Sequence, residues 1–188
     1  MEKLLSDRVN AMATSATLAM AAKARELKSQ GKDIIGLSLG EPDFTIPEFI
    51  KDAAVKAIRD DVHAYPPVDG YAELKNAIIT KFKRDNNLSY GPSQIVVSTG
   101  AKQSLANITM VMLNPGDEVI LPAPYWVSYR DLVKLAEGVP VEIPTTIKTN
   151  FKITPQQLEA AITPKTKLIM YSSPCNPSGS VYNKEELR

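Results

Sequence analysis

The sequence lacks most features that would point to secretion, membrane insertion or nucleic-acid binding. Its 188 residues include a single cysteine, Cys175, which excludes an internal disulfide framework and suits a reducing compartment. No apolar run approaches the length of a membrane span, and residues 1–10 lack the apolar core of a signal peptide. The 22 basic residues balance 21 acidic ones, which argues against nucleic acid or an anionic membrane as the main partner. We therefore expect a cytoplasmic protein.

Several chemical signals are also absent. His63 is the only histidine, and because it lies in a loop without a partner motif we assign it no catalytic role. Cys175 has no histidine spaced to activate it as a nucleophile, so we interpret it as a tolerated small residue. The turn at 98–103 has neither the Gly-x-Gly-x-x-Gly spacing nor the Walker pattern, which argues against a nucleotide-binding module. We also expect no metal site.

What the chain does contain is an alternation of apolar strands and amphipathic helices. We expect strands at 34–39, 95–97, 118–121, 139–143 and 167–171, and helices at 11–31, 47–60, 74–82, 105–112, 126–137 and 155–162. This order predicts an α/β fold with a mostly parallel sheet and helices on both faces. In such sheets, ligands gather at the carboxyl ends of the strands.

The stretch 94–113 is the one around which the rest is organised. An apolar run at 95–97 breaks at Ser98-Thr99-Gly100 and continues with helical spacing. A strand that turns through glycine into a helix points the unsatisfied N–H groups of the helix at one spot, and these attract phosphate. Lys102 adds a positive charge in the first turn. Because similar joints without a ligand are common, this turn alone leaves anion binding and a plain turn both open.

Five motifs in a fixed order carry a resemblance to a known family. They are Gly-Glu-Pro-Asp at 40–43, Tyr-Pro-Pro-Val-Asp-Gly at 65–70, Thr-Gly-Ala-Lys-Gln at 99–103, Pro-Tyr-Trp at 124–126 and Ser-Ser-Pro-Cys-Asn-Pro-Ser-Gly at 172–179. Together they resemble the class I pyridoxal-phosphate-dependent aminotransferases, most closely the bacterial aspartate aminotransferase branch. The resemblance implies that 33–188 form an incomplete large domain that binds pyridoxal 5′-phosphate. It implies that the helical segment 1–32 contributes to a small, lid-like domain, and that the parent is a homodimer.

The resemblance also implies roles for residues around the cofactor. It assigns the backbone amides of Gly100, Ala101 and Lys102 to the phosphate, Trp126 to stacking on the pyridine ring, and Asn176 to the ring oxygen. It places Trp126 and Asn176 against the substrate as well. Each role has a structural alternative, because a lone tryptophan is often a core residue and Asn-Pro is a common turn pair.

Other implied roles concern the subunit boundary and the substrate. Tyr65 matches a tyrosine that reaches the phosphate of the partner subunit, and Gly40 matches a position whose backbone meets the substrate α-carboxylate. Ser15, Thr17 and the Lys102 side chain match residues that meet the distal carboxylate of aspartate or glutamate. Ser15 and Thr17 serve equally well as helix-cap hydroxyls.

The resemblance assigns no catalytic residue to this chain, because the Schiff-base lysine of the family lies beyond the position of Arg188. Residues 183–186 look like a helix start cut short, so we expect Arg188 to be a cut point. The expected parent transfers an amino group between an L-amino acid, with aspartate as the first expectation, and 2-oxoglutarate; the isolated chain is expected to be inactive. The alternatives are an aminotransferase for prephenate, alanine or aromatic amino acids, and a non-catalytic phosphate-ligand-binding or interaction domain.

Overall fold

The computed structural model describes residues 4–12, 16–37, 40 and 42–188; the side chains of Ala16 and Thr17 lie outside the description. The chain divides into two compact units. One consists of Met1–Lys23 with Ala101–Arg188 and contains the sheet, and the other consists of Ala24–Gly100 and is mainly helical. The predicted boundary between residues 32 and 33 stays a prediction.

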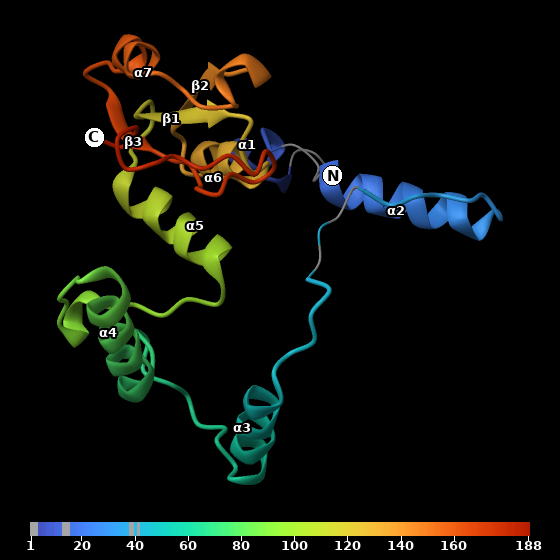
Figure 1. Cartoon of the computed structure of the whole chain (residues 1–188), viewed down its shortest axis with the longest axis vertical. Coiled ribbons are helices and arrows are strands. Elements are labelled where there is room, and N and C mark those ends of the chain that lie inside the picture. Colours follow the sequence, from blue (N-terminus) through green and yellow to red (C-terminus); the bar gives the residue numbers. More distant parts are fainter. Residues whose placement is uncertain (1–3, 13–15, 38–39, 41) are drawn as a thin grey trace. The chain divides into compact units, whose positions relative to one another are not determined.

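The sheet of the first unit has three parallel strands in the order β2-β1-β3 (Figure 1). The central strand β1 covers Glu118–Ala123, and its neighbours are β2, Val139–Pro144, and β3, Thr166–Ile169. Glu118 lies opposite Val139 of β2 and Thr166 of β3. The strands predicted at 118–121, 139–143 and 167–171 are therefore confirmed, as is their parallel arrangement.

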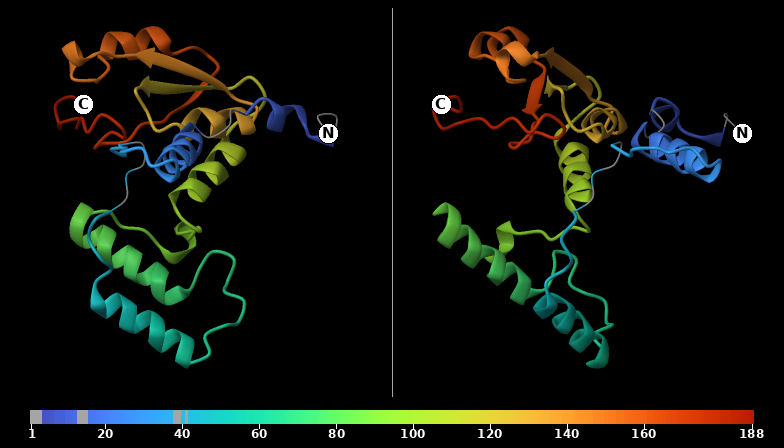
Figure 2. Two further views of the ribbon diagram at one scale, coloured as in Figure 1. Left: turned by 90° about the vertical axis from the view of Figure 1, so that its right-hand side faces the viewer. Right: turned by 45° about the vertical axis from the view of Figure 1, so that its right-hand side comes forward.

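Helices cover both faces of this sheet, as the alternation of elements predicts. Helix α6, Ser128–Leu135, packs on β1 and β2 and against α5, Ala101–Met112, whereas α7, Pro155–Ala161, contacts β2 on the opposite side (Figures 1 and 2). Val119 and Leu121 point from β1 toward α6 because alternate strand residues share a face. The core residues on this face are Leu113, Val119, Leu121, Tyr129, Val133, Ala136 and Met170.

The sequence Thr154-Pro155-Gln156-Gln157 has the form of a capping box, and helix α7 starts there. The Thr154 hydroxyl accepts a hydrogen bond from the Gln157 N–H at 3.2 Å, and the Gln157 side chain accepts one from the Thr154 N–H at 3.0 Å. Pro155 occupies the first helical position, where its missing N–H costs nothing. The same reciprocal pair forms between Asn183 and Glu186, at 2.8 and 2.9 Å, although residues 184–187 form turns and no regular helix.

Three of the remaining helices overlap the predicted ranges 11–31, 47–60 and 74–82, and the others were not predicted. Helix α1 covers Asp7–Asn10, α2 covers Ala16–Ser29, α3 covers Glu48–Arg59 and α4 covers Ala72–Asn86, with short 3-10 helices η2 at Pro92–Gln94 and η3 at Ile147–Thr149. Ser15, one predicted cap of the N-terminal helix, lies outside the described residues. Pro47 was predicted to be the first residue of the helix 47–60. It is instead the N-cap residue of α3, because its ψ of 141° is extended.

Two predicted strands are wrong. Residues 95–97 form no strand, although Ile95 is buried, because a strand needs a neighbouring strand to complete its ladder. Instead, the Val97 N–H donates to the carbonyl of Asp69 in a loop, at 3.1 Å. Of the predicted strand 34–39, the described residues 34–37 also lack strand structure, and most of them are exposed. Apolar runs alone do not show whether such a neighbour exists.

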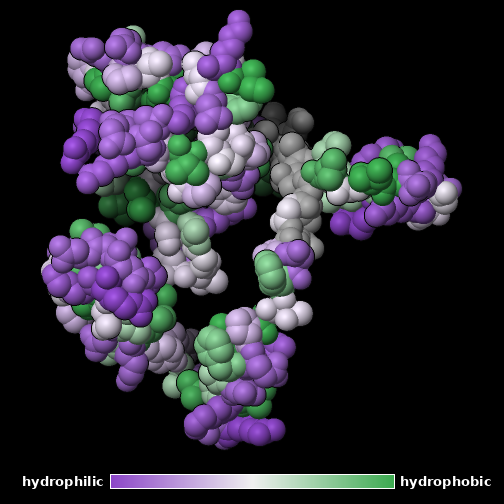
Figure 3. Space-filling view, in the orientation of Figure 1, coloured by the Kyte–Doolittle hydropathy of each residue, from purple (hydrophilic) through white to green (hydrophobic). Residues whose placement is uncertain are grey.

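The second unit carries an apolar surface on α3. Phe49, Ile50, Val55 and Ile58 are exposed on this amphipathic helix, where Figure 3 shows green side chains. Lys75 of α4 is buried and forms an ion pair with Asp69; this hydrogen bond is the main reason why the pKa of Asp69 is lowered. Among the described helices, none has the length and apolar character needed to cross a membrane.

Candidate functional site

The loops that follow β1 and β3 meet at the carboxyl ends of these two parallel strands. The Sγ atom of Cys175, in the loop after β3, donates to the carbonyl oxygen of Pro124, in the loop after β1, at 3.3 Å. This contact brings the segment containing Asn176 against the segment containing Trp126. No motif in the sequence predicted that Cys175 joins these two loops. Only its position next to Asn176, in a predicted strand-end loop, placed it near the candidate site.

Trp126 lies at the edge of the core with part of its indole exposed. It packs edge-on against Tyr129, with ring centroids 5.7 Å apart and an interplanar angle of 89°. The Lys102 ammonium lies over the indole, 5.0 Å from the ring centroid, in a cation–π contact. The structure therefore brings Lys102 and Trp126 together, and Trp126 is neither a fully buried core residue nor a free surface residue.

Lys102 reaches the indole from the first turn of α5. The residue before this helix, Gly100, has a φ of +85°, which an L side chain rarely adopts, so the turn itself requires glycine. The first N–H groups of an α-helix have no partner within the helix and carry the positive end of its dipole. The first turn of α5 contains no acidic residue. Amides, dipole and ammonium thus combine into a locally positive site for an anion.

Asn176 belongs to a loop with several internal hydrogen bonds. The Cys175 N–H donates to the Ser180 carbonyl at 2.8 Å, and the Gly179 N–H donates to the Cys175 carbonyl at 2.7 Å. The backbone N–H of Asn176 donates to the Ser172 hydroxyl at 3.2 Å. Its side-chain amide is exposed and makes no hydrogen bond to any described residue, so it can contact a ligand.

Tyr125, the residue directly before Trp126, anchors the loop after β1 to the sheet. The sequence did not predict this role. Its hydroxyl donates to the Glu142 carboxylate at 2.8 Å, and its ring stacks on Tyr129 with centroids 6.4 Å apart. Burial, and then the hydrogen bond to Glu142, raise the pKa of Tyr125 to about 12. Tyr125 therefore remains a hydrogen-bond donor at neutral pH. Because Glu142 belongs to β2, no local pattern around Tyr125 could reveal this pairing.

The structure does not test the roles predicted for four other residues. Tyr65 and Gly40 belong to the second unit, where both are exposed, and a Cβ atom built on Gly40 meets no described heavy atom within 4 Å. Ser15 lies outside the described residues, and Thr17 lies in α2 with an undescribed side chain. The roles of these four residues stay predictions.

A separate apolar groove of about 340 Å³ lies on the sheet face opposite α6. Pro122, Leu158, Ile169 and Leu187 contribute to its lining, and none of the candidate residues does. We therefore do not assign it to the site. Among the described residues, no cluster of three or more histidine, cysteine, aspartate or glutamate side chains could hold a metal ion.

Comparison with known proteins decides the family. The family model described as "Aminotransferase class I and II" matches residues 32–188. The chain belongs to this family. The matched range includes every candidate residue except Ser15 and Thr17.

Aspartate aminotransferases are among the aminotransferases that this chain matches. It is 58% identical over 184 residues to an aspartate/prephenate aminotransferase of Nitrosomonas europaea, covering 98% of this chain and 46% of that protein. It is 54% identical over 187 residues to an aspartate aminotransferase of a Bacillus species, covering 100% and 48%. A crystal structure of the Rhizobium meliloti aspartate aminotransferase matches with a TM-score of 0.93 and 46% identity, covering 98% and 46%. The chain thus spans about half the length of the relatives it matches.

Proposed function

We propose that this chain is the N-terminal part of a pyridoxal-phosphate-dependent enzyme that transfers an amino group between aspartate and 2-oxoglutarate. The observation that carries the proposal is the contact of Lys102 with Trp126 beside the N-terminus of α5, 5.0 Å from ammonium to ring centroid. A cation, helix amides and an aromatic face in one place match a ligand that combines a phosphate with a flat ring. The names of the relatives support the same reaction class.

The residues present fit pyridoxal phosphate. The amides of Ala101 and Lys102 would hold its phosphate, Trp126 would cover one face of its ring, and the side chain of Asn176 would donate to its ring oxygen. The Gly100 N–H, the third predicted donor, instead donates to the Ser98 carbonyl at 2.8 Å. When bound, the cofactor withdraws electrons from the amino-acid carbon and thereby makes its proton acidic. The half-buried indole would exclude water from one side of the ring, and the loop that contacts Pro124 would hold the Asn176 amide near it.

The Lys102 side chain favours a substrate with a second carboxylate. An ammonium on a flexible stem binds a carboxylate as a point charge, and aspartate and 2-oxoglutarate each carry a distal carboxylate. Prephenate also carries two carboxylates, and a relative with 58% identity is named an aspartate/prephenate aminotransferase. Transfer to prephenate is therefore the second candidate function. Alanine and aromatic amino acids lack this group, which makes them weaker candidates.

Trp126 provides a direct test of the cofactor site because it is the only tryptophan of the chain. Adding pyridoxal phosphate to the 188-residue chain should quench its fluorescence with a saturable curve. Pyridoxal without the phosphate should bind more weakly, and inorganic phosphate should compete. Quenching that does not saturate, or equal affinity for the phosphorylated and unphosphorylated ligands, would contradict the proposed site.

The substrate preference requires a protein of the same length as its relatives. Such a protein should transfer the amino group of aspartate to 2-oxoglutarate, and at saturating pyridoxal phosphate Lys102→Met should raise the KM for aspartate but not for alanine. If alanine and aspartate respond equally, Lys102 does not recognise the second carboxylate. The cytoplasmic location, the homodimer and the inactivity of the isolated chain stay predictions.

A further inference from the structure

We propose that Tyr182 is a positioning residue that closes the base of loop 172–181 and thereby holds Asn176 beside Trp126. This inference rests on the proposed function, because it concerns the cofactor contact assigned to Asn176. The resemblance to the family assigns no role to Tyr182. The contacts of Tyr182 tie this residue to both ends of the loop and to a segment outside it.

The first contacts close the loop on itself. The Tyr182 N–H donates to the Ser173 hydroxyl at 3.1 Å, and the Tyr182 ring packs edge-on against Tyr171, with centroids 5.6 Å apart. Tyr171 comes two residues after the end of β3, so these contacts join the exit of the loop to its entrance. Between them, the loop is fixed by its own hydrogen bonds and by the contact of Cys175 with Pro124.

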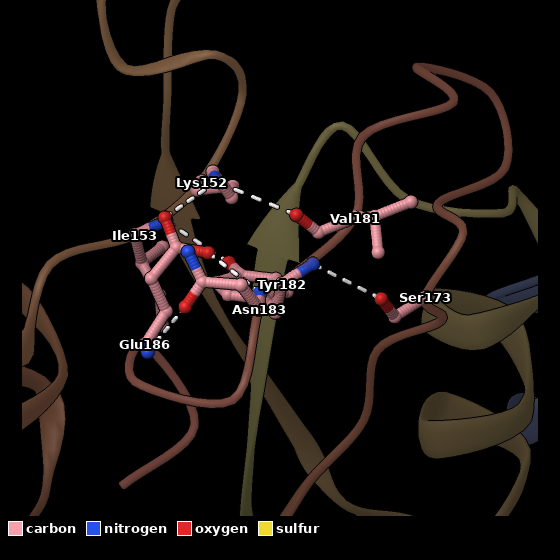
Figure 4. A network of polar contacts seen from close by, with 7 residues as sticks. All are labelled: Lys152, Ile153, Ser173, Val181, Tyr182, Asn183 and Glu186. Carbon is pink, nitrogen blue, oxygen red and sulfur yellow. Dashed lines mark hydrogen bonds and ion pairs between the residues drawn. The ribbon is translucent and has the colours of Figure 1, made fainter.

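The second set of contacts fixes Tyr182 from outside the loop (Figure 4). Its hydroxyl accepts a hydrogen bond from the Ile153 N–H at 3.0 Å, in the segment before α7. Lys152 lies 5.9 Å from the centroid of the Tyr182 ring, donates to the Val181 carbonyl at 3.4 Å and forms an ion pair with Glu186. The Lys152 side chain is only 17% exposed, which protects this ion pair from full screening by solvent.

The consequence is a mechanical link from the α7 segment to the site. A loop closed at its base and fixed at its exit loses most of its freedom before a ligand arrives, so ligand binding costs less ordering entropy. Asn176 lies within this closed loop, and its amide has no other described partner to orient it. Loss of the Tyr182 hydroxyl should therefore weaken ligand binding through Asn176, without any contact between Tyr182 and the ligand.

The test compares Tyr182→Phe with Tyr171→Phe. Both substitutions remove one hydroxyl and keep the ring, but within the described part of the chain only the Tyr182 hydroxyl has a hydrogen-bond partner. Affinity for pyridoxal phosphate is measured by quenching of Trp126 in the 188-residue chain. Tyr182→Phe should raise the Kd about two- to tenfold, the effect of one net hydrogen bond, and Tyr171→Phe should leave it unchanged. Asn176→Ala should raise it too, and the double variant Asn176→Ala/Tyr182→Phe should be no weaker than Asn176→Ala alone.

Amide hydrogen exchange separates failure of this inference from failure of the proposed function. Tyr182→Phe and Ser173→Ala should each speed exchange at 173–181 and leave the core amides of 119–121 unchanged, which shows that the chain is still folded. Unchanged exchange at 173–181 overturns the role of Tyr182 whether or not the cofactor binds. Additive losses of affinity in the double variant also overturn it. If the unmodified chain does not bind pyridoxal phosphate while exchange responds as expected, the proposed function fails, and with it the role of Asn176.

Discussion

Replacing Lys102 by methionine tests the candidate site most directly, because it removes the charge and keeps an apolar stem of similar length. Two opposite charges about 4 Å apart interact by about 1 kcal/mol in bulk water and by about 4 kcal/mol at an effective dielectric constant of about 20. Lys102 is exposed, so the lower part of this range applies. A loss of about 1–2 kcal/mol corresponds to a rise in Kd of about five- to thirtyfold for pyridoxal phosphate.

The folded chain itself should hardly respond to this substitution. The Lys102 ammonium lies at the positive end of the α5 dipole, and removing it relieves about 0.3–1 kcal/mol of repulsion. The same change removes the cation–π contact with Trp126, which contributes about 0.5–1 kcal/mol at an exposed position. The two terms have opposite signs, so the free energy of unfolding should change by less than about 1 kcal/mol. A large loss of stability would mean that Lys102 has a structural role.

The assay is quenching of Trp126 by pyridoxal phosphate and by pyridoxal at low and high salt. Lys102→Met should weaken binding of the phosphorylated ligand only, and the effect should shrink as the Debye length falls from about 10 Å at 0.1 M salt to about 3 Å at 1 M. Lys165→Met is the matched control, because this exposed lysine precedes β3 at the opposite edge of the sheet. Equal losses in the two variants, or equal losses for the two ligands, would refute an anion site at α5.

Three further predictions concern close packing and one hydrogen bond within the two units. Gly138→Ala places a Cβ atom 3.0 Å from the Leu113 side chain, and urea denaturation should show a loss of about 1–3 kcal/mol in the free energy of unfolding. An unchanged midpoint would mean that the core side chains move to accommodate the methyl group. The pKa of Tyr125 is raised from 10.0 to about 12, so its contribution to stability is present below pH 10 and is lost as pH rises toward 12. The difference in unfolding free energy between wild type and Tyr125→Phe should therefore become smaller between pH 10 and pH 12. A constant difference would contradict the raised pKa. Gly70→Ala combines a φ of +100° with a Cβ atom 2.6 Å from Val97, so thermal unfolding should show a loss of about 1–3 kcal/mol or more, of which Val97→Ala restores only part.

Local signals in the sequence predicted local structure well. The reciprocal hydrogen bonds at Thr154–Gln157 and Asn183–Glu186 involve residues three apart, so their formation depends little on the rest of the chain. Gly31, predicted to end the N-terminal helix, has a φ of +79° and lies two residues after Ser29, the last residue of α2. In each case the residues that make the contact are those that carry the sequence signal.

Strand prediction failed where the partner was not local. The run at 95–97 has the same apolar character as β1, and Ile95 is buried as a core strand residue would be. Hydrophobicity predicts burial, but a strand also needs a neighbouring strand with which to form hydrogen bonds. The Val97 N–H donates to a loop carbonyl instead. The parallel order of the other strands was predictable because helices separate them in the sequence.

The same distinction applies to the candidate site. Parallel topology predicts that strand-end loops share one edge, and the contact of Cys175 with Pro124, between the loops after β3 and β1, agrees with it. The contact of Lys102 with Trp126 does not follow from this rule, because residues 95–97 form no strand before α5. The contacts that orient these loops were not predictable. The hydrogen bond from Tyr125 to Glu142 depends on the register of β2 against β1, and the bond from Ile153 to Tyr182 joins residues 29 apart.

Helix α5 differs in its charge pattern from helices α3, α4 and α6, and this difference supports the assignment of the site, although α2 likewise has no acidic residue in its first turn. Helices α3, α4 and α6 each have an acidic residue in the first turn and a basic residue in the last, as the helix dipole favours. Helix α5 has no acidic residue in its first turn and has Lys102 there instead. A repulsive charge in a first turn lowers helix stability, so its presence requires a compensating interaction. The indole of Trp126 compensates part of that repulsion, and a bound phosphate would reverse it.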